Sequence, residues 1–193
     1  MQHFKTRMAE KRKLSYLIAL LTIFFSCSVS HRKLNNGEGN SVPKEDYVWT
    51  NQSKFNPEAY NQIDTSYFYE LVDEYWSDNK FRKIRNIQYE TLWKKKLQFY
   101  SNGRVRRFAS KLANPNPEIT GNRGIVYDEQ NNLKIDFLEG VSNNRIVINS
   151  YKVKVEGEYI YMFETSIQNE KYCSVYKKSD FVNDEYKKFK ADW

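Results

Sequence analysis

The stretch Lys95–Phe108, KKLQFYSNGRVRRF, decides the fold, because apolar and polar residues alternate in it on both sides of a turn. Alternation with a period of two is typical of a strand that buries one face. Asn102 and Gly103 are the pair that a two-residue hairpin turn prefers, since its backbone needs positive φ angles. The stretch therefore predicts a β-hairpin with a two-residue loop.

The same period of two continues along the chain, and turn-forming Asn, Gly and Gln residues separate the runs. About eight short strands in hairpin sequence predict a mainly β fold, an antiparallel meander that forms a lipocalin-like barrel or half-barrel. An open sheet covered by helices is the alternative. The predicted strands are Ile87–Trp93, Lys95–Tyr100, Arg104–Phe108, Arg123–Asp128, Leu133–Leu138, Arg145–Val155, Glu158–Ser166 and Lys171–Lys177.

Two of these strands show how their faces should lie. In Leu133–Leu138 the apolar residues Leu133, Ile135 and Phe137 alternate with Lys134 and Asp136, which predicts one dry and one wet side. In Tyr159–Phe163, YIYMF, both faces are apolar. Such a strand belongs in the centre of a sheet, or between a barrel interior and a covering helix.

Two helices are expected, one before the strands in the sequence and one after them. Asp64–Lys80 has aromatic and aliphatic residues at spacings of one, three and four, which predicts an amphipathic N-terminal helix on the sheet. Ser179–Trp193 predicts a short C-terminal helix, capped by Ser179 or Asp180. The aromatic segment Tyr47–Ile63 is expected to be irregular and to pack on the fold.

The N-terminus has the layout of a signal peptide, with five Lys or Arg residues before an apolar core, Leu14–Phe25. This core has about twelve residues, whereas a helix that crosses the hydrocarbon needs roughly twenty. Cys27 follows Ser26 directly after the core, as in a bacterial lipobox, although Phe24 and Phe25 stand where Leu and a small residue are usual. We expect Cys27 to be the lipidated first residue; the alternative is an ordinary cysteine near an ordinary cleavage site.

The chain then divides into three parts: a lipoprotein signal peptide (1–26), the lipidated cysteine with a polar flexible tether (27–46), and a single β-rich domain (47–193). The net charge of +7 is concentrated in the first part, whose five cationic residues and one Glu leave +3 for the rest. A mixed surface of +3 does not indicate a nucleic-acid partner. Cys173 has no partner for a disulfide if Cys27 is acylated, and its alternating context predicts burial.

These features resemble small lipoproteins of the Bacteroidota, some of which carry a lipocalin-like domain. The similar segments are the lipobox-like FFSC, the polar tether, KLQFYSNGRVRRF, the chain of hairpins, CSVYKKSD and the terminal KADW. The resemblance implies a lipocalin-like β-barrel with palmitate-type acylation at Cys27 and attachment to a membrane of the cell envelope. That family is largely without assigned function, so the resemblance carries over no active residue.

The residues available for catalysis are few, because the only histidines are His3 and His31, both outside the predicted domain. This excludes His-dependent nucleophilic triads and the usual zinc or non-haem iron ligand sets in the domain. No nucleotide-binding glycine motif occurs. We therefore expect no enzyme, no cofactor and no metal. A carboxylate pair among Asp128, Glu129, Asp136 and Glu139 is the remaining route to a glycan-acting enzyme.

Binding is the more accessible function. A two-residue loop would place Arg104 and Arg106 on the same face as Leu97 and Phe99, next to Lys95, as a mixed cationic and apolar surface. Such a surface suits an anionic amphiphile or lipid head groups; a charged edge that prevents strand aggregation is the alternative.

Aromatic residues make up 16% of the chain, and those with a polar edge, such as Tyr159 and Tyr161, suit stacking at a barrel mouth. The expected function is thus non-catalytic binding of a small apolar or anionic ligand, or of an envelope partner, by a monomer. A structural or assembly subunit without a pocket is the alternative. Basic residues after Cys27 favour the periplasmic side of the outer membrane.

Overall fold

The computed structural model describes residues 31–33, 41–43, 49–87, 94–109, 114–141, 145–165 and 169–193, with the backbone alone for 31–33, 41–43, 140–141 and 145–146. The predicted signal peptide, Cys27 and most of the predicted strand Ile87–Trp93 lie outside the described residues. Within the stretch predicted as a tether, β1 (His31–Lys33) pairs antiparallel with β2 (Ser41–Pro43). None of the described helices is long and apolar enough to cross a membrane.

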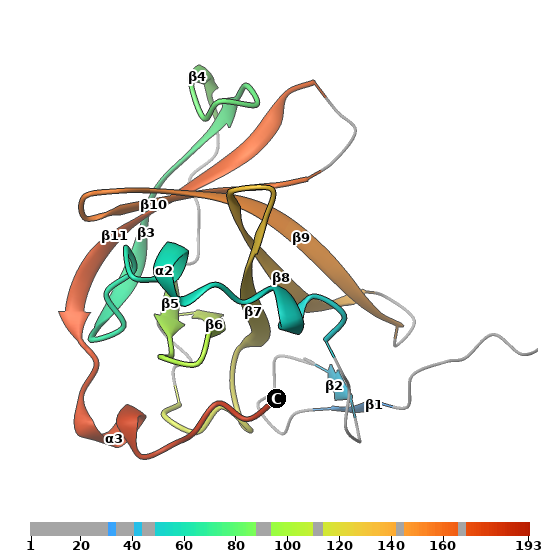
Figure 1. The fold of residues 1–193 in the computed structure, drawn as a ribbon, viewed down its shortest axis with the longest axis vertical. Helices are drawn as coiled ribbons and strands as arrows, with labels where there is room; N and C mark the ends of the chain where they lie inside the picture. The colour runs from blue at the N-terminus through green and yellow to red at the C-terminus, as the bar shows by residue number, and fades with distance from the viewer. Residues whose placement is uncertain are drawn as a thin grey trace, which may run out of the picture. The chain divides into compact units, whose positions relative to one another are not determined.

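Eight strands form a closed antiparallel barrel, which confirms the predicted fold class (Figure 1). Each strand pairs with the next along the chain, and β11 pairs with β3 to close the barrel. A further strand, β4 (Lys83–Asn86), pairs with the end of β3. The barrel strands are β3 (Tyr67–Ser77), β5 (Lys95–Phe99), β6 (Arg104–Ala109), β7 (Asn122–Glu129), β8 (Asn132–Val141), β9 (Arg145–Glu156), β10 (Tyr159–Glu164) and β11 (Lys171–Phe181).

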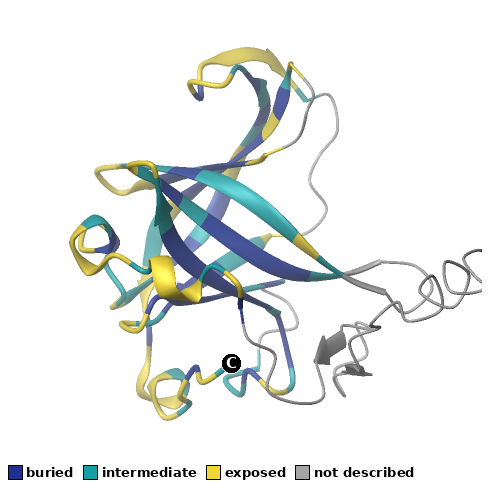
Figure 2. Ribbon diagram, turned by 45° about the vertical axis from the view of Figure 1, so that its right-hand side comes forward, coloured by how far each residue is buried: buried dark blue, intermediate teal, exposed yellow. Residues whose placement is uncertain are grey.

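The barrel interior is a packed core, because every second residue of a strand points inward. Neighbouring rings meet edge to face, as Tyr69 and Phe99 do with centroids 5.6 Å apart. Burial of this apolar surface contributes roughly 25 cal/mol per Å² to folding. The inward residues include Tyr69, Leu71, Leu97, Phe99, Val105, Val126, Leu133, Ile135, Phe137, Val153, Ile160, Met162 and Tyr176. Figure 2 shows the barrel strands as mostly buried or intermediate.

The segment from Trp49 to Ile63 covers one end of the barrel and confirms that this irregular stretch packs on the fold. It contains η1 (Gln52–Lys54) and α2 (Pro57–Tyr60), the latter capped by the side chain of Asn56. Tyr60 is buried and its hydroxyl donates a hydrogen bond of 2.7 Å to the carbonyl oxygen of Tyr100. The apolar interior is therefore covered at the end where β5 turns into β6.

The predicted N-terminal helix at Asp64–Lys80 is wrong, because most of this segment is β3. Leu71 pairs with Tyr176 and Asp73 with Val175, so Val72 is an extra residue in β3. This bulge shifts the alternation of inward and outward side chains by one position. In addition, apolar residues lie on both faces of the strand. Together they give apolar spacings of one, three and four, as in a helix. Only the pairing of this segment with β11 on one side and with β5 and β4 on the other shows that it is a strand.

The predicted two-residue loop in the β5–β6 hairpin is also wrong. Tyr100 and Arg104 close the loop, since the Tyr100 amide donates to the Arg104 carbonyl oxygen at 2.9 Å. Three residues lie between this closing pair, and of these Gly103 has a positive φ of 76° while Asn102 does not. A turn of this length with glycine last is the second common hairpin type. One extra loop residue reverses the face of every residue in β6.

The C-terminal segment leaves the barrel after β11 and runs back across its outer wall (Figure 1). It contains one short helix, α3 (Asp184–Lys187), which Asn183 caps by accepting a hydrogen bond from the Tyr186 amide. The predicted helix is thus present but much shorter, and the predicted caps Ser179 and Asp180 still belong to β11. The ring of Tyr186 packs edge to face on Phe68 at 5.0 Å.

The predicted faces of β8 and β10 are largely confirmed. Leu133, Ile135 and Phe137 point inward, but Asp136 is buried on the outer wall rather than wet. Its carboxylate accepts hydrogen bonds from Asn51, Tyr127 and Ser150 at 2.9, 3.0 and 2.6 Å. In β10 the outward rings of Tyr161 and Phe163 contact Phe81 of the β3–β4 turn rather than a helix, and Tyr159 is exposed. The free Cys173 is completely buried, as predicted.

Candidate functional site

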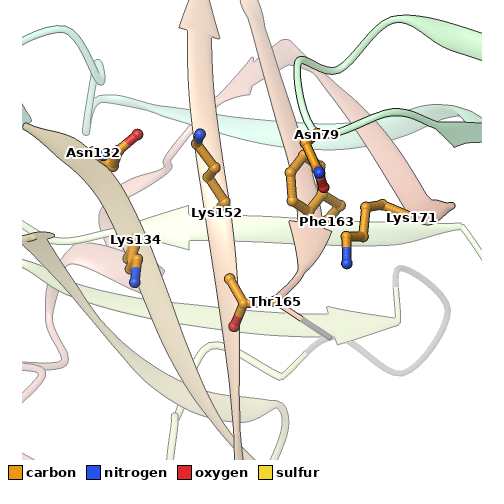
Figure 3. Close-up of a pocket in the computed structure, with 7 residues that line it drawn as sticks. All are labelled: Asn79, Asn132, Lys134, Lys152, Phe163, Thr165 and Lys171. Atoms are coloured by element: carbon orange, nitrogen blue, oxygen red, sulfur yellow. The ribbon is translucent and has the colours of Figure 1, made fainter. Parts of the chain in front are cut away.

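A pocket of about 280 Å³ lies on the outer wall of the barrel, beside the turn between β3 and β4 (Figure 3). Three lysines from three different strands surround it, together with amide and hydroxyl groups and one aromatic ring. We call it the lysine pocket. Its lining residues are Asn79, Asn132, Lys134, Lys152, Phe163, Thr165 and Lys171.

The barrel register places the central lining residues in one row. Lys134 of β8 lies opposite Lys152 of β9, which lies opposite Phe163 of β10. Since partners in a ladder share a face, all three point to the outer wall. Figure 3 shows Lys152 between the other two, with its amino group directed away from that of Lys134. Like charges directly opposite each other destabilise a sheet, so this row favours an anion nearby.

The β3–β4 turn forms one wall of the pocket and holds a bulky residue in an unusual backbone conformation. Phe81 has a φ of 65°, which is rare for an aromatic residue and costs of order 1–3 kcal/mol. Its ring lies 4.5 Å from that of Phe163, and its carbonyl oxygen accepts a hydrogen bond of 3.0 Å from the Tyr75 hydroxyl. These contacts fix the turn that carries Asn79 against the barrel wall.

Asp78 stabilises the same turn from within. Its carboxylate accepts from the amides of Lys80 and Arg82 at 2.8 and 3.0 Å, and from the Arg82 side chain at 2.6 Å. These bonds, led by the Arg82 amide, hold the pKa of Asp78 below its usual range. Asn79 therefore projects from a turn that is fixed on both sides.

The pocket carries an excess of positive charge. Glu129 neutralises Lys134 at 2.5 Å and also binds Lys54 at 2.6 Å, so one carboxylate serves two lysines. The hydrogen bond from Lys134, followed by that from Lys54, lowers the pKa of Glu129 to about 2. The Lys152 side chain makes no hydrogen bond or ion pair with any residue that the structure describes. Lys171, which also lines the pocket, is buried, with 6% of its surface exposed.

The chemistry of this lining suits the binding of an anion. Ammonium groups attract anions as point charges, while amide and hydroxyl groups can complete their hydrogen bonds. The lining contains neither a cysteine nor a carboxylate. Within the described ranges no three His, Cys, Asp or Glu residues gather in a way that could hold a metal ion.

Two of the predicted site residues, Arg104 and Arg106, are buried in the structure. Arg104 and Arg106 lie on the face opposite Leu97 and Phe99, because Phe99 pairs with Val105 rather than with Arg104. Only 8% of Arg104 and none of Arg106 is exposed. The predicted mixed cationic and apolar surface is therefore wrong, and the cause is the extra loop residue of the hairpin.

The predicted residue Lys95 points into the opposite, polar end of the barrel. The central ion pair there joins Arg107 and Glu139, and Glu139 also accepts from Asn149 at 2.7 Å and from Tyr151 at 2.9 Å. Burial, and then the charge of Arg107, lowers the pKa of Lys95. Because donors and acceptors within this group satisfy one another, it favours a structural role.

The last two predicted residues, Tyr159 and Tyr161, lie on the outer wall of β10. Their ring centroids are 6.4 Å apart, and Lys177 and Lys154 lie 5.7 and 5.2 Å from the two rings. Neither tyrosine lines the lysine pocket. The stacking surface predicted at these two tyrosines stays a prediction.

Sequence reasoning missed all the residues of the lysine pocket. Lys134 and Lys152 each alternate with inward residues, so their outward orientation could be read from the strand pattern. Their proximity depends on the register between β8 and β9, and Asn79 comes from the β3–β4 turn, much earlier in the chain. The only available signal was the repeated lysine on outward positions.

Comparisons of the chain with known protein families, with curated proteins and with solved structures give no match. The class that the fold and the site define is a closed eight-stranded antiparallel β-barrel with a cationic pocket on its outer wall.

Proposed function

We propose that this protein is a non-catalytic binding lipoprotein of the cell envelope, whose barrel takes a small anionic molecule at the lysine pocket. The observation that carries the proposal is the row of Lys134, Lys152 and Phe163, in which two lysines face each other across paired strands and one lacks an acidic partner among the described residues. An anion bound there would neutralise Lys152, since Glu129 already pairs with Lys134.

The location on the outer wall follows from the packed interior. A lipocalin-type barrel that carries an apolar ligand in its lumen needs an interior cavity. Here Leu97, Ile135, Phe137 and Ile160 are completely buried against one another in the middle of the barrel. The same observation favours the second candidate function, a structural or assembly subunit of an envelope complex, for which no small ligand is needed.

A sugar acid fits the volume and the lining better than a bare ion. A pocket of about 280 Å³ is near the lower limit of typical ligand sites. The carboxylate would lie between Lys152 and Lys171, while Asn79, Asn132 and Thr165 offer hydrogen bonds to hydroxyl groups.

Calorimetric titration with glucuronate and with neutral glucose tests the proposal. We expect glucuronate to bind, glucose not to bind, and Lys152→Ala to weaken glucuronate binding about tenfold through loss of one charge-assisted hydrogen bond. Lys154→Ala is the matched control, because this lysine lies on the same face of β9 but outside the pocket lining. If wild type and Lys152→Ala bind equally, or neither binds, the structural-subunit function replaces this one.

The anchor is tested separately, since it does not depend on the pocket. We expect labelled palmitate to be incorporated into the wild-type protein and not into Cys27→Ser, which should become soluble or keep its full signal length. Stable attachment requires more than one acyl chain, which an acylated N-terminal cysteine provides. Lack of label in the wild type would remove the anchor and leave the binding proposal untouched.

A further inference from the structure

Three arginines gather on the outer wall where β6 and β7 pair. Arg106 lies directly opposite Arg123, and Arg104 stands two residues before Arg106 on the same face. Tyr100, which closes the hairpin loop with Arg104, shares this face. We call these four residues the arginine face.

The arginine face is covered, so its charges lie away from water. The exposed fractions are 8% for Arg104, 0% for Arg106 and 7% for Arg123. The C-terminal segment lies over it: the ring of Tyr186 is 5.4 Å from the Arg106 guanidinium, and the ring of Trp193 is 5.2 Å from that of Arg123.

The loop between β6 and β7 completes the cover. Its Gly121, with φ of 90°, leaves room for Arg106, since a Cβ there would lie 2.8 Å from the Arg106 Cγ. Any other residue at this position would meet both a strained backbone and the arginine side chain. The loop is thus shaped around Arg106.

The positive charge of this face is not balanced by the described residues. Glu118 pairs with Arg123, whereas Arg106 donates only to uncharged acceptors, the carbonyl oxygens of Asn114 and Pro115 and the Gln98 side chain. The Arg104 side chain donates no hydrogen bond to any described residue.

Nearby acids do not supply the missing charge. Those of the covering segment, Asp184, Glu185 and Asp192, form no ion pair with the three arginines where the structure describes them. Asp136 lies two strands from Arg104, beyond Ile125, and its oxygens are taken by Asn51, Tyr127 and Ser150. Buried cations without such a partner are costly.

Four donors of the arginine face are buried without a partner: the Nε atoms of Arg104, Arg106 and Arg123, and the hydroxyl of Tyr100. Buried polar groups in folded proteins are almost always hydrogen-bonded, so each of these donors indicates an acceptor that the described residues do not provide. Burial raises the pKa of Tyr100, against the opposing effect of Arg106 and Arg123, so this hydroxyl stays protonated and can donate.

We propose that the arginine face is an oxyanion site that takes a tetrahedral phosphate or sulfate, free or as the end of a small ester. Guanidinium groups match such oxygens in pairs of hydrogen bonds, and an ion with several acceptor oxygens can serve several donors at once. The buried position favours a small ion over a membrane surface. This site is separate from the lysine pocket and does not depend on it.

Thermal unfolding and calorimetry with inorganic phosphate and sulfate, against chloride at equal ionic strength, test the site. We expect both oxyanions to raise the melting temperature of the wild type, and Tyr100→Phe and Arg104→Gln each to weaken binding about tenfold. Neither replaced group bonds to a described residue, so both variants should fold. Lys152→Ala should bind phosphate at this site like the wild type, which separates the two sites.

Crystals soaked in selenate locate the ion by anomalous scattering, and the expected position is among the guanidinium groups of Arg104, Arg106 and Arg123. Titration with glycerol phosphate and with phosphatidylglycerol vesicles shows which kind of molecule carries the bound phosphate. Binding of glycerol phosphate alone indicates a soluble ester, whereas binding of the vesicles indicates a lipid head group. Absence of selenate from the arginine face, or equal phosphate binding by wild type and both variants, overturns the proposal.

Discussion

The lysine pocket and the arginine face each place three cations on the outer wall of the same barrel, yet they are built in opposite ways. The lysines surround a space, and the nearest carboxylate, Glu129, pairs with Lys134 alone among them. The arginines lie under a covering segment, where Arg106 donates to carbonyl oxygens and aromatic rings face Arg106 and Arg123. An ammonium group is strongly hydrated, while a planar guanidinium stacks on rings and tolerates burial. The comparison shows that the lysines should matter for binding and the arginines for folding as well.

The largest effect is expected from Arg106→Ala. The substitution leaves the Asn114, Pro115 and Gln98 acceptors without their donor and removes a guanidinium that lies 4.7 Å from the Phe108 ring. We expect a loss of about 3 kcal/mol in the free energy of unfolding, measured by urea denaturation. The control Arg82→Ala removes a side chain that is 75% exposed and should change it by less than about 0.5 kcal/mol. Equal effects of Arg106→Ala and Arg82→Ala would mean that the buried contacts of Arg106 contribute nothing to the free energy of unfolding.

The next effect concerns Gly103, whose backbone sets the loop length that places Arg104 and Arg106 outside. A Cβ at this position would lie 2.4 Å from the Phe55 ring, in addition to the strain of a positive φ. Gly157 has a positive φ as well but open space around it. We expect Gly157→Ala to cost about 1 kcal/mol and Gly103→Ala about 2–3 kcal/mol in thermal or urea unfolding. Similar costs would show that the Phe55 contact is unimportant.

A smaller, pH-dependent effect is expected at the edge of the lysine pocket. Because the folded protein holds the pKa of Glu129 at about 2, below its ordinary 4.5, this group stabilises the fold fully above pH 4.5. The contribution is lost as the pH falls from about 4.5 to about 2, and Glu129→Gln should lack this step. Carboxyl NMR titration of Glu129 measures it directly, and a midpoint near 4.5 would contradict the shared ion pair.

The smallest effect on stability is expected from Lys152→Ala, the variant that should weaken binding at the lysine pocket about tenfold. The Lys152 side chain bonds to no described residue, so its removal should leave the free energy of unfolding within about 0.5 kcal/mol of the wild type. A clear destabilisation would show that Lys152 is structural, and the contrast with Arg106 would disappear.

The strand pattern was sufficient to predict the fold class, since the alternation of Leu133, Ile135 and Phe137 depends only on the geometry of a pleated strand. It failed at β3, where the bulge at Val72 and apolar residues on both faces produced a helix-like spacing. It failed again at the hairpin loop, where Asn102 and Gly103 suggested a shorter turn than the one observed. In both places one inserted residue reversed the faces that follow.

The sequence by itself determined that the chain forms an antiparallel β meander, that Cys173 is buried, and that the domain lacks histidine chemistry. These properties depend on residue types and on a local period of two. Only the tertiary structure decided that Arg106 is buried, that Lys134 and Lys152 are neighbours, and that Asn79 joins them. Such proximities depend on strand register and on turns distant in the chain, which local periodicity does not encode.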